Sequence, residues 1–92
     1  MEGNSNAQDD AGIRRRIQKD IDMFEGSIAE ASAIEAVADK KVRKVIDLAR
    51  MYASDSNSYL SKGDLYTSFS CISYAHGLLD AVKGIYGKER DI

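Results

Sequence analysis

The chain of 92 residues contains no proline, and this absence restricts its fold more than any other feature of the sequence. Average usage supplies about five prolines in a chain of this length, and a proline in a helix interior breaks or kinks the helix. Glycine, the next strongest interruption, is absent between Gly26 and Gly63. The sequence therefore favours long helices and an all-α fold.

A single apolar stripe runs along the first third of the chain. Its residues follow one another at steps of three or four, which is the spacing of one face of a helix. Asp9 or Asp10 is suited to cap the start, because an acidic side chain there accepts backbone N–H bonds and favours the helix dipole. The stripe consists of Ile13, Ile17, Ile21, Phe24, Ile28 and Ala31.

A break is expected near residues 34–38. One unbroken helix between Gly26 and Gly63 would hold about 36 residues and span about 54 Å, roughly four times the radius of gyration of a compact chain of this size. Asp39 follows the expected break and is suited to cap a second helix. The apolar stripe of that helix comprises Val42, Val45, Ala49, Tyr52, Ser56, Tyr59 and Leu60.

The sequence Lys62-Gly63-Asp64 predicts a tight turn into a third helix, because it joins a basic last-turn residue, a glycine and an acidic cap. We expect that helix to end at Gly87. The result is an all-α fold, a three-helix up-down-up bundle over residues 10–87, between a disordered tail of residues 1–9 and a C-terminal tail of residues 88–92. The core face of the third helix carries Leu65, Phe69, Ile72, His76, Leu79 and Tyr86.

Charge and cysteine content bear on partners and compartment. Thirteen basic and fifteen acidic residues give a formal net charge of −2, so we expect neither nucleic acid nor an anionic membrane as partner. The single cysteine, Cys71, has no partner for an internal disulfide, which favours a reducing cytoplasm. Residues 1–10 are too polar for a signal peptide, and no uncharged stretch reaches the roughly 20 residues of a membrane helix.

The third helix is unusually poor in charge. From Leu65 to Leu79 no residue is charged, whereas charged residues make up 30 % of the chain. A chain this short buries only about 60–65 % of its unfolded surface, so a second copy would add much-needed burial. We therefore expect a homodimer; the alternative is that this face meets water. The candidate interface is Tyr66, Ser70, Tyr74, Gly77, Leu78, Ala81 and Ile85.

One group of polar side chains is a candidate polar cluster: Asp55, His76 and Asp80. His76 and Asp80 lie four residues apart and share a helix face. A metal- or nucleotide-dependent activity centred on these three residues is one alternative function. A zinc site needs further His or Cys ligands, so we expect a structural pair, with no catalytic residue, no metal and no cofactor.

Two basic clusters give a second alternative, RNA binding. The first is residues 14–16 with Lys19, and the second is Lys40, Lys41, Arg43 and Lys44. No aromatic residue lies within either cluster to stack on a base, so we interpret both as solvated helix faces.

The sequence Tyr59-Leu60-Ser61-Lys62-Gly63-Asp64, followed by Tyr74-Ala75-His76-Gly77-Leu78-Leu79-Asp80-Ala81, resembles the signature of a small archaeal family catalogued as domain of unknown function 357. The resemblance spans roughly residues 13–87. It implies a helical bundle and no known activity, and Asp55 lies outside it. It also implies that six residues matter: Gly63, Asp64, Tyr74, His76, Gly77 and Asp80. We therefore expect a non-catalytic interaction or scaffold module.

Overall fold

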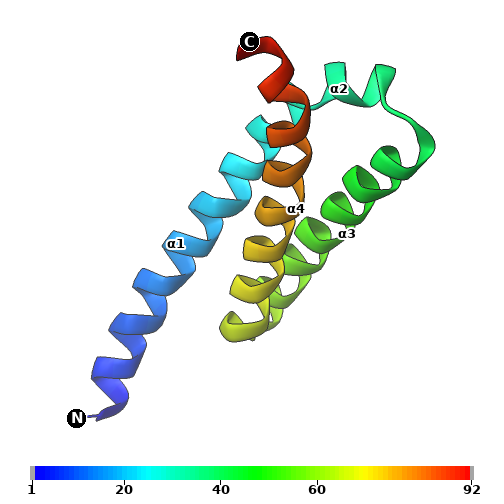
Figure 1. The fold of residues 1–92 in the computed structure, drawn as a ribbon. Helices are drawn as coiled ribbons and strands as arrows, with labels where there is room; N and C mark the ends of the chain where they lie inside the picture. The colour runs from blue at the N-terminus through cyan, green and yellow to red at the C-terminus, as the bar shows by residue number, and fades with distance from the viewer. Residues whose placement is uncertain (1, 92) are drawn as a thin grey trace.

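The computed structural model describes the backbone of residues 2–91 and the side-chain surroundings of residues 10–86. Its four helices are α1 (Glu2–Glu30), α2 (Ser32–Val37), α3 (Lys40–Lys62) and α4 (Leu65–Asp91), and residues 2–91 contain no strand. α1 runs along the body, α2 crosses one end, α3 returns and α4 runs back beside it (Figure 1). This confirms the all-α, up-down-up order of three long helices.

The two outer helices extend further than predicted. α1 begins at Glu2 rather than at Asp9 or Asp10, and α4 continues past Gly87 to Asp91. The segments expected as tails, residues 1–9 and 88–92, are therefore helical where the structure describes them, while Met1 and Ile92 lie outside the described residues. Neither segment contains a proline to stop a helix. The mobility of these ends stays a prediction.

The break before α3 lies at Ala38 and is shorter than the expected turn of residues 34–38. Ala38 has an extended backbone, and the Asp39 carboxylate accepts a hydrogen bond from the Val42 N–H at 3.0 Å, which confirms the predicted cap. Residues 34–37 belong instead to α2, because nothing in Ser32–Val37 opposes helix formation strongly.

The hairpin between α3 and α4 has the predicted geometry. Gly63 has a φ of +87°, in the left-handed region that favours glycine. Its N–H donates to the Leu60 carbonyl at 3.1 Å, and the Asp64 N–H donates to the Tyr59 carbonyl at 3.0 Å. The Asp64 carboxylate accepts from the Thr67 N–H at 3.1 Å and caps α4. Local chemistry therefore ends one helix and starts the next.

The core lies where the three long helices meet, and α4 makes more of its contacts with α3 than with α1. Four of the six residues in the predicted stripe of α1 are buried, Ile28 is half-buried and Ile13 is exposed. Ile46 of α3 is fully buried although the predicted stripe omitted it. The core cluster comprises Ile17, Ile21, Phe24, Ala31, Ala49, Leu60, Ile72, Ala75 and Leu79.

The core face of α4 is rotated from the one predicted. Phe69 was expected in the core but is 44 % exposed, and His76 is only half-buried. The small residues Ser68 and Ala75 are fully buried instead, and at Ser68 the helices α3 and α4 lie close enough for its hydroxyl to reach the Ser56 carbonyl at 2.7 Å. The residues that face inward are Ser68, Ile72, Ala75, Leu79 and Val82.

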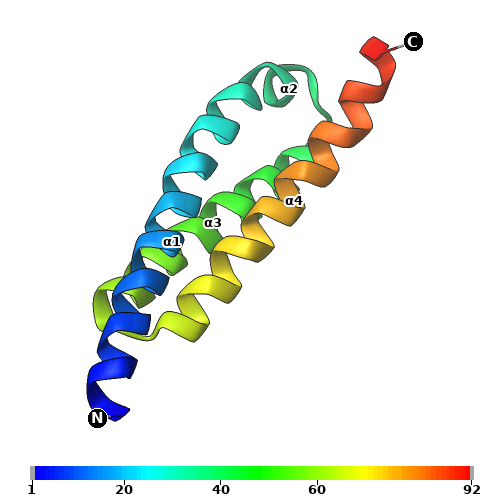
Figure 2. The same cartoon turned by 90° about the vertical axis from the view of Figure 1, so that its left-hand side faces the viewer.

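The molecule is long and flat. Its radius of gyration is 15.6 Å and its principal extents are 55 × 24 × 15 Å. A compact domain of this length has a radius of gyration of about 12 Å. The turned view shows the N-terminus at one end of the body and the C-terminus at the other (Figure 2). An elongated bundle exposes more helix surface per residue than a compact one, which bears on the site described below.

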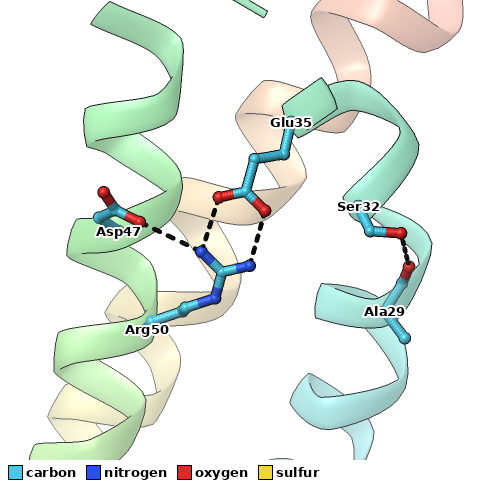
Figure 3. A network of polar contacts seen from close by, with 5 residues as sticks. All are labelled: Ala29, Ser32, Glu35, Asp47 and Arg50. Carbon is cyan, nitrogen blue, oxygen red and sulfur yellow. Dashed lines mark hydrogen bonds and ion pairs between the residues drawn. The ribbon is translucent and has the colours of Figure 1, made fainter. Parts of the chain in front are cut away.

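Ion pairs hold the short helix α2 against its neighbour. The Arg50 guanidinium of α3 donates two hydrogen bonds of 2.8 Å to the Glu35 carboxylate of α2 and one of 3.1 Å to Asp47 (Figure 3). The Ser32 hydroxyl donates to the Ala29 carbonyl at 2.8 Å across the junction of α1 and α2. α2 buries no residue fully, and Ile34 is half-buried, so these polar contacts add to a small apolar contact.

The Glu35 contact predicts a change in stability with pH. The hydrogen bond from Arg50 lowers the pKa of Glu35 from its ordinary value of 4.5, outweighing the effect of burial. A lowered pKa stabilises the folded state above the unfolded pKa, and this contribution is lost as the pH falls through the folded pKa. We expect the melting temperature of Glu35→Gln to lie below that of the wild type at neutral pH and the gap to close in acid.

Thermal melts at a series of pH values measure this gap. The control is Glu25→Gln, which alters an exposed carboxylate on α1 that makes no ion pair among the described residues. A gap for Glu35→Gln that is the same at pH 3 and pH 7 would contradict the pairing with Arg50.

Candidate functional site

The candidate interface lies along the side of α4 that faces away from the bundle. Tyr66 is 84 % exposed, Tyr74 52 % and Ile85 62 %. Leu78 differs, because it is half-buried and packs against the core. We call the exposed residues the outer face of α4: Tyr66, Ser70, Tyr74, Gly77, Ala81 and Ile85.

The outer face is free of charge over most of its length. Between Leu65 and Leu79 the helix has no ionised side chain. Beyond this stretch, the Lys83 ammonium donates to the Glu30 carboxylate of α1 at 2.8 Å and is therefore directed away from the outer face. A long, exposed and uncharged surface of this kind is typical of a place where proteins associate.

Two internal contacts order this face. The rings of Tyr74 and Tyr52 of α3 meet edge to face, with centroids 4.7 Å apart. The Ser70 hydroxyl donates to the Tyr66 carbonyl at 3.0 Å, one turn back along α4. At Gly77, as at Gly26 and Gly84, an added Cβ atom would meet no atom of the described residues within 4 Å, so their packing does not require glycine there. The outer face thus carries one tyrosine ring that packs on α3, at Tyr74, and one position without a side chain, at Gly77.

An apolar hollow of about 430 Å³ continues the outer face toward α1. Ile13 and Phe69, which sequence reasoning assigned to the core, line it and are each 44 % exposed. The hollow lies near the hairpin of α3 and α4, where Arg14 of α1 also reaches the Leu60 carbonyl at 3.3 Å. The lining residues are Ile13, Arg16, Ile17, Leu65, Tyr66 and Phe69.

The structure does not bring the candidate polar cluster together. The His76 Nε2 atom lies 2.8 Å from the Asp20 carbonyl of α1, and the ring meets Phe24 edge to face at 5.6 Å. A carbonyl only accepts, so Nε2 carries the proton in this hydrogen bond. Within residues 10–86, His76 makes no hydrogen bond to Asp55 or Asp80, and no three His, Cys, Asp or Glu side chains are placed to hold a metal.

Cys71 lies half-buried on the side of α4 that faces α3. Burial raises the pKa of its thiol, and the negative charges of Asp55 and Asp64 raise it further. A raised pKa keeps the thiol protonated near neutral pH, whereas a nucleophile or a metal ligand needs the thiolate. The surroundings of Cys71 therefore suit a packed side chain.

The residues of the first basic cluster differ in their contacts. The Arg14 guanidinium donates to the Leu60 carbonyl at 3.3 Å, so it helps to end α3 and is withdrawn from the cluster. Arg15, Arg16 and Lys19 stay exposed and line an open hollow of about 470 Å³ with Asp20 and Met23, all on α1. In the second cluster Lys40, Lys41, Arg43 and Lys44 are exposed on α3.

A comparison with protein families covers most of this bundle. A family model described as a protein of unknown function, DUF357, matches residues 19–86, from the middle of α1 through α4. The chain belongs to the DUF357 family. No curated protein matches the DUF357 chain. The archaeal source that the resemblance implied stays a prediction. No helix among residues 2–91 of this DUF357 protein has a stretch both long and apolar enough to cross a membrane.

The signature residues of this DUF357 protein have distinct places. Gly63 and Asp64 form the hairpin turn, and His76 binds the backbone of α1. Tyr74 and Gly77 lie on the outer face of α4, next to each other along the helix surface. Asp80 is exposed. Two signature residues therefore lie in the candidate interface, and three others hold the fold together through the hairpin turn and a contact with α1.

Proposed function

We propose that this DUF357 protein is a non-catalytic, cytoplasmic interaction or scaffold module that self-associates through the outer face of α4. The observation that carries the proposal is the combination of exposure and missing charge on that face. Tyr66, Tyr74 and Ile85 are all more than half exposed, and the two tyrosines lie within fifteen consecutive residues that have no ionised group.

The energetics favour a second copy. Burying the exposed parts of Tyr66, Tyr74 and Ile85 contributes several kcal/mol per copy at about 25 cal/mol per Å² of apolar surface. Association costs at least about 4 kcal/mol of lost translational and rotational freedom. A two-fold pair buries the same residues twice, which offsets more of this cost than covering one face alone. The elongated body, with a radius of gyration of 15.6 Å, leaves this surface for a partner to bury.

The surroundings of His76 and Cys71 support the non-catalytic part of the proposal, because these residue types commonly act as a base or a nucleophile. The Nε2 atom of His76 is engaged with a backbone carbonyl, and the raised pKa of Cys71 keeps its thiol protonated. Neither group is set up as a base or a nucleophile. The alternatives that we carried from the sequence, a metal- or nucleotide-dependent activity and RNA binding, have no comparable geometric support.

Sedimentation equilibrium tests self-association directly. We expect the wild-type protein at tens of micromolar to sediment with twice the chain mass of 10.1 kDa. Tyr66→Glu and Ile85→Glu place a charge on the outer face at side chains that have little packing to lose. Each is expected to raise the dissociation constant at least about tenfold, the equivalent of roughly 1.4 kcal/mol.

The matched control is Met23→Glu, which adds the same charge at a 55 % exposed apolar residue of α1. It is expected to leave the dissociation constant unchanged. A wild-type protein that stays monomeric at tens of micromolar would refute self-association. Equal weakening by Met23→Glu and the two α4 variants would place the interface elsewhere.

A further inference from the structure

We propose that two copies of the chain pair through their outer faces with the two α4 helices antiparallel, about a two-fold axis that places Tyr74 of each copy over Gly77 of the other. This inference rests on the proposed function and specifies which partner surface the outer face meets and in which register.

The spacing of the outer face suits an antiparallel pair. Its residues are 66, 70, 74, 77, 81 and 85, at steps of 4, 4, 3, 4 and 4, and this series reads the same in both directions. A two-fold axis between positions 74 and 77 then brings three kinds of pair to the same level: Tyr66 with Ile85, Ser70 with Ala81, and Tyr74 with Gly77. An isologous interface needs such a self-complementary arrangement.

Size decides between this register and a parallel one. Antiparallel pairing sets the largest side chain near the centre, Tyr74, against the smallest, Gly77. Parallel pairing about an axis along the helices would set each residue against its own copy, so that ring meets ring at Tyr74 and a gap remains at Gly77. Interfaces pack at the density of protein interiors, and only the antiparallel order fills the gap.

Among the described residues, nothing packs against Gly77 closely enough to require a glycine. A Cβ atom added there meets nothing within 4 Å, yet glycine in a helix interior is about 1 kcal/mol less favourable than alanine. In the proposed pair a ring lies directly on the backbone of α4 at Gly77, and any side chain there would hold that ring away. Gly26 and Gly84 are equally open and are not among the paired positions.

Tyr74 is prepared for this contact. Its ring already packs edge to face on Tyr52, with centroids 4.7 Å apart, and about half of it stays exposed. A side chain that is ordered before binding loses less conformational entropy on association. The fixed ring of one copy and the open Gly77 backbone of the other therefore fit as knob and hole.

The register also extends the contact at its ends. It brings Ile85 of the second copy to Tyr66, which lines the apolar hollow beside Ile13 and Phe69. The exposed parts of Tyr66 and Tyr74 in two copies amount to on the order of 500 Å², taking about 200 Å² for a whole tyrosine side chain. A standard interface buries about 1,600 Å² in total, so a contact centred on these rings and extended by Ile85 and Ala81 belongs to the small, weak class of interfaces.

Disulfide trapping distinguishes the registers. In a Cys71→Ala background, Ser70→Cys and Ala81→Cys are made as separate proteins. Both positions are exposed, and both substitutions change the size of the side chain little. A disulfide forms only where the Cα atoms lie within about 7 Å. In the antiparallel pair the two copies of position 70 lie eleven residues of helix apart, about 16 Å, whereas position 70 faces position 81.

We expect a disulfide-linked dimer when the two cysteine variants are mixed and oxidised, and none from either variant alone; mass spectrometry identifies the mixed species. Linkage of each variant to itself would overturn the antiparallel register while leaving the proposed function intact. A protein that sediments as a dimer but links in no combination would overturn the register too. A monomeric protein would overturn both proposals.

A second pair of variants tests the knob and hole. Gly77→Leu is expected to raise the dissociation constant at least about tenfold, because the leucine occupies the place of the Tyr74 ring of the second copy. The control is Gly26→Leu on α1, where an added Cβ atom also meets nothing within 4 Å. Equal dissociation constants for the two variants would overturn the contact between Tyr74 and Gly77.

Discussion

Replacing Leu79 by alanine is expected to reduce the free energy of unfolding by about 3 kcal/mol, within the 2–5 kcal/mol typical of a buried leucine. Leu79 is fully buried in α4 and belongs to the cluster in which all three long helices meet. The change removes apolar area from the core and leaves a cavity that rigid helices fill only in part. The free energy of unfolding of a native protein is only about 5–15 kcal/mol in total, so this loss is a large share of it.

Urea denaturation followed by circular dichroism measures this loss, with all proteins at one concentration because association shifts apparent stability. The matched control is Leu48→Ala on α3, where the leucine is 37 % exposed. It is expected to cost clearly less than Leu79→Ala. If the two changes cost the same, the rotation of α4 about its own axis differs from the one described.

The helix ends that rest on local chemistry could be predicted from the sequence. Asp39 caps α3, Gly63 takes the left-handed conformation, and Asp64 caps α4, as expected from their residue types. Each of these signals acts over three or four residues. The contact of α2 with α3 includes instead the pairing of Arg50 with Glu35 across fifteen residues, which no local pattern contains.

The rotation of α4 could not be predicted, because it depends on where its neighbours lie. Helical spacing from Leu65 through Phe69 and Ile72 predicted the core face and left Ser68 and Ala75 out of it. In the structure the small residues take inner positions, α3 lies within hydrogen-bond reach of Ser68, and Phe69 lies 44 % exposed at the edge. A stripe of small side chains is therefore a sign of close helix packing as well as of exposure.

The outer face of α4 could be predicted from the sequence, because the absence of charged residues from Leu65 to Leu79 is a property of the sequence itself. The candidate polar cluster was not assembled, because the partner of His76 is a backbone carbonyl of α1, 56 residues earlier in the chain. Every residue has such a carbonyl, so residue types carry no signal for this contact. Spacing along one helix therefore suggested the Asp80 side chain as the partner of His76, whereas its partner in the fold is the backbone carbonyl of Asp20.

Close packing of α3 on α4 centres on a buried pair of serines. The Ser56 hydroxyl donates to the Ser68 carbonyl at 2.7 Å, and the Ser68 hydroxyl donates to the Ser56 carbonyl at the same distance. The two hydroxyl oxygens lie 3.1 Å apart, and both residues are fully buried. Such reciprocal bonds require the two helix backbones to lie within the reach of one short side chain. The hairpin therefore has no room for a larger residue at either position.

Ser56→Leu is expected to reduce the free energy of unfolding by about 3 kcal/mol, at the upper end of the typical cost of overpacking a core. The leucine forces α3 and α4 apart and removes the hydrogen bond to Ser68. The control is Ser58→Leu, two residues along the same helix at an exposed position, with an expected change within about 0.5 kcal/mol. Ser56→Ala separates the two causes, because it removes the hydroxyl without adding bulk and is expected to cost about 1 kcal/mol. Equal urea midpoints for Ser56→Leu and Ser58→Leu would mean that the two helices do not approach each other closely at the serine pair.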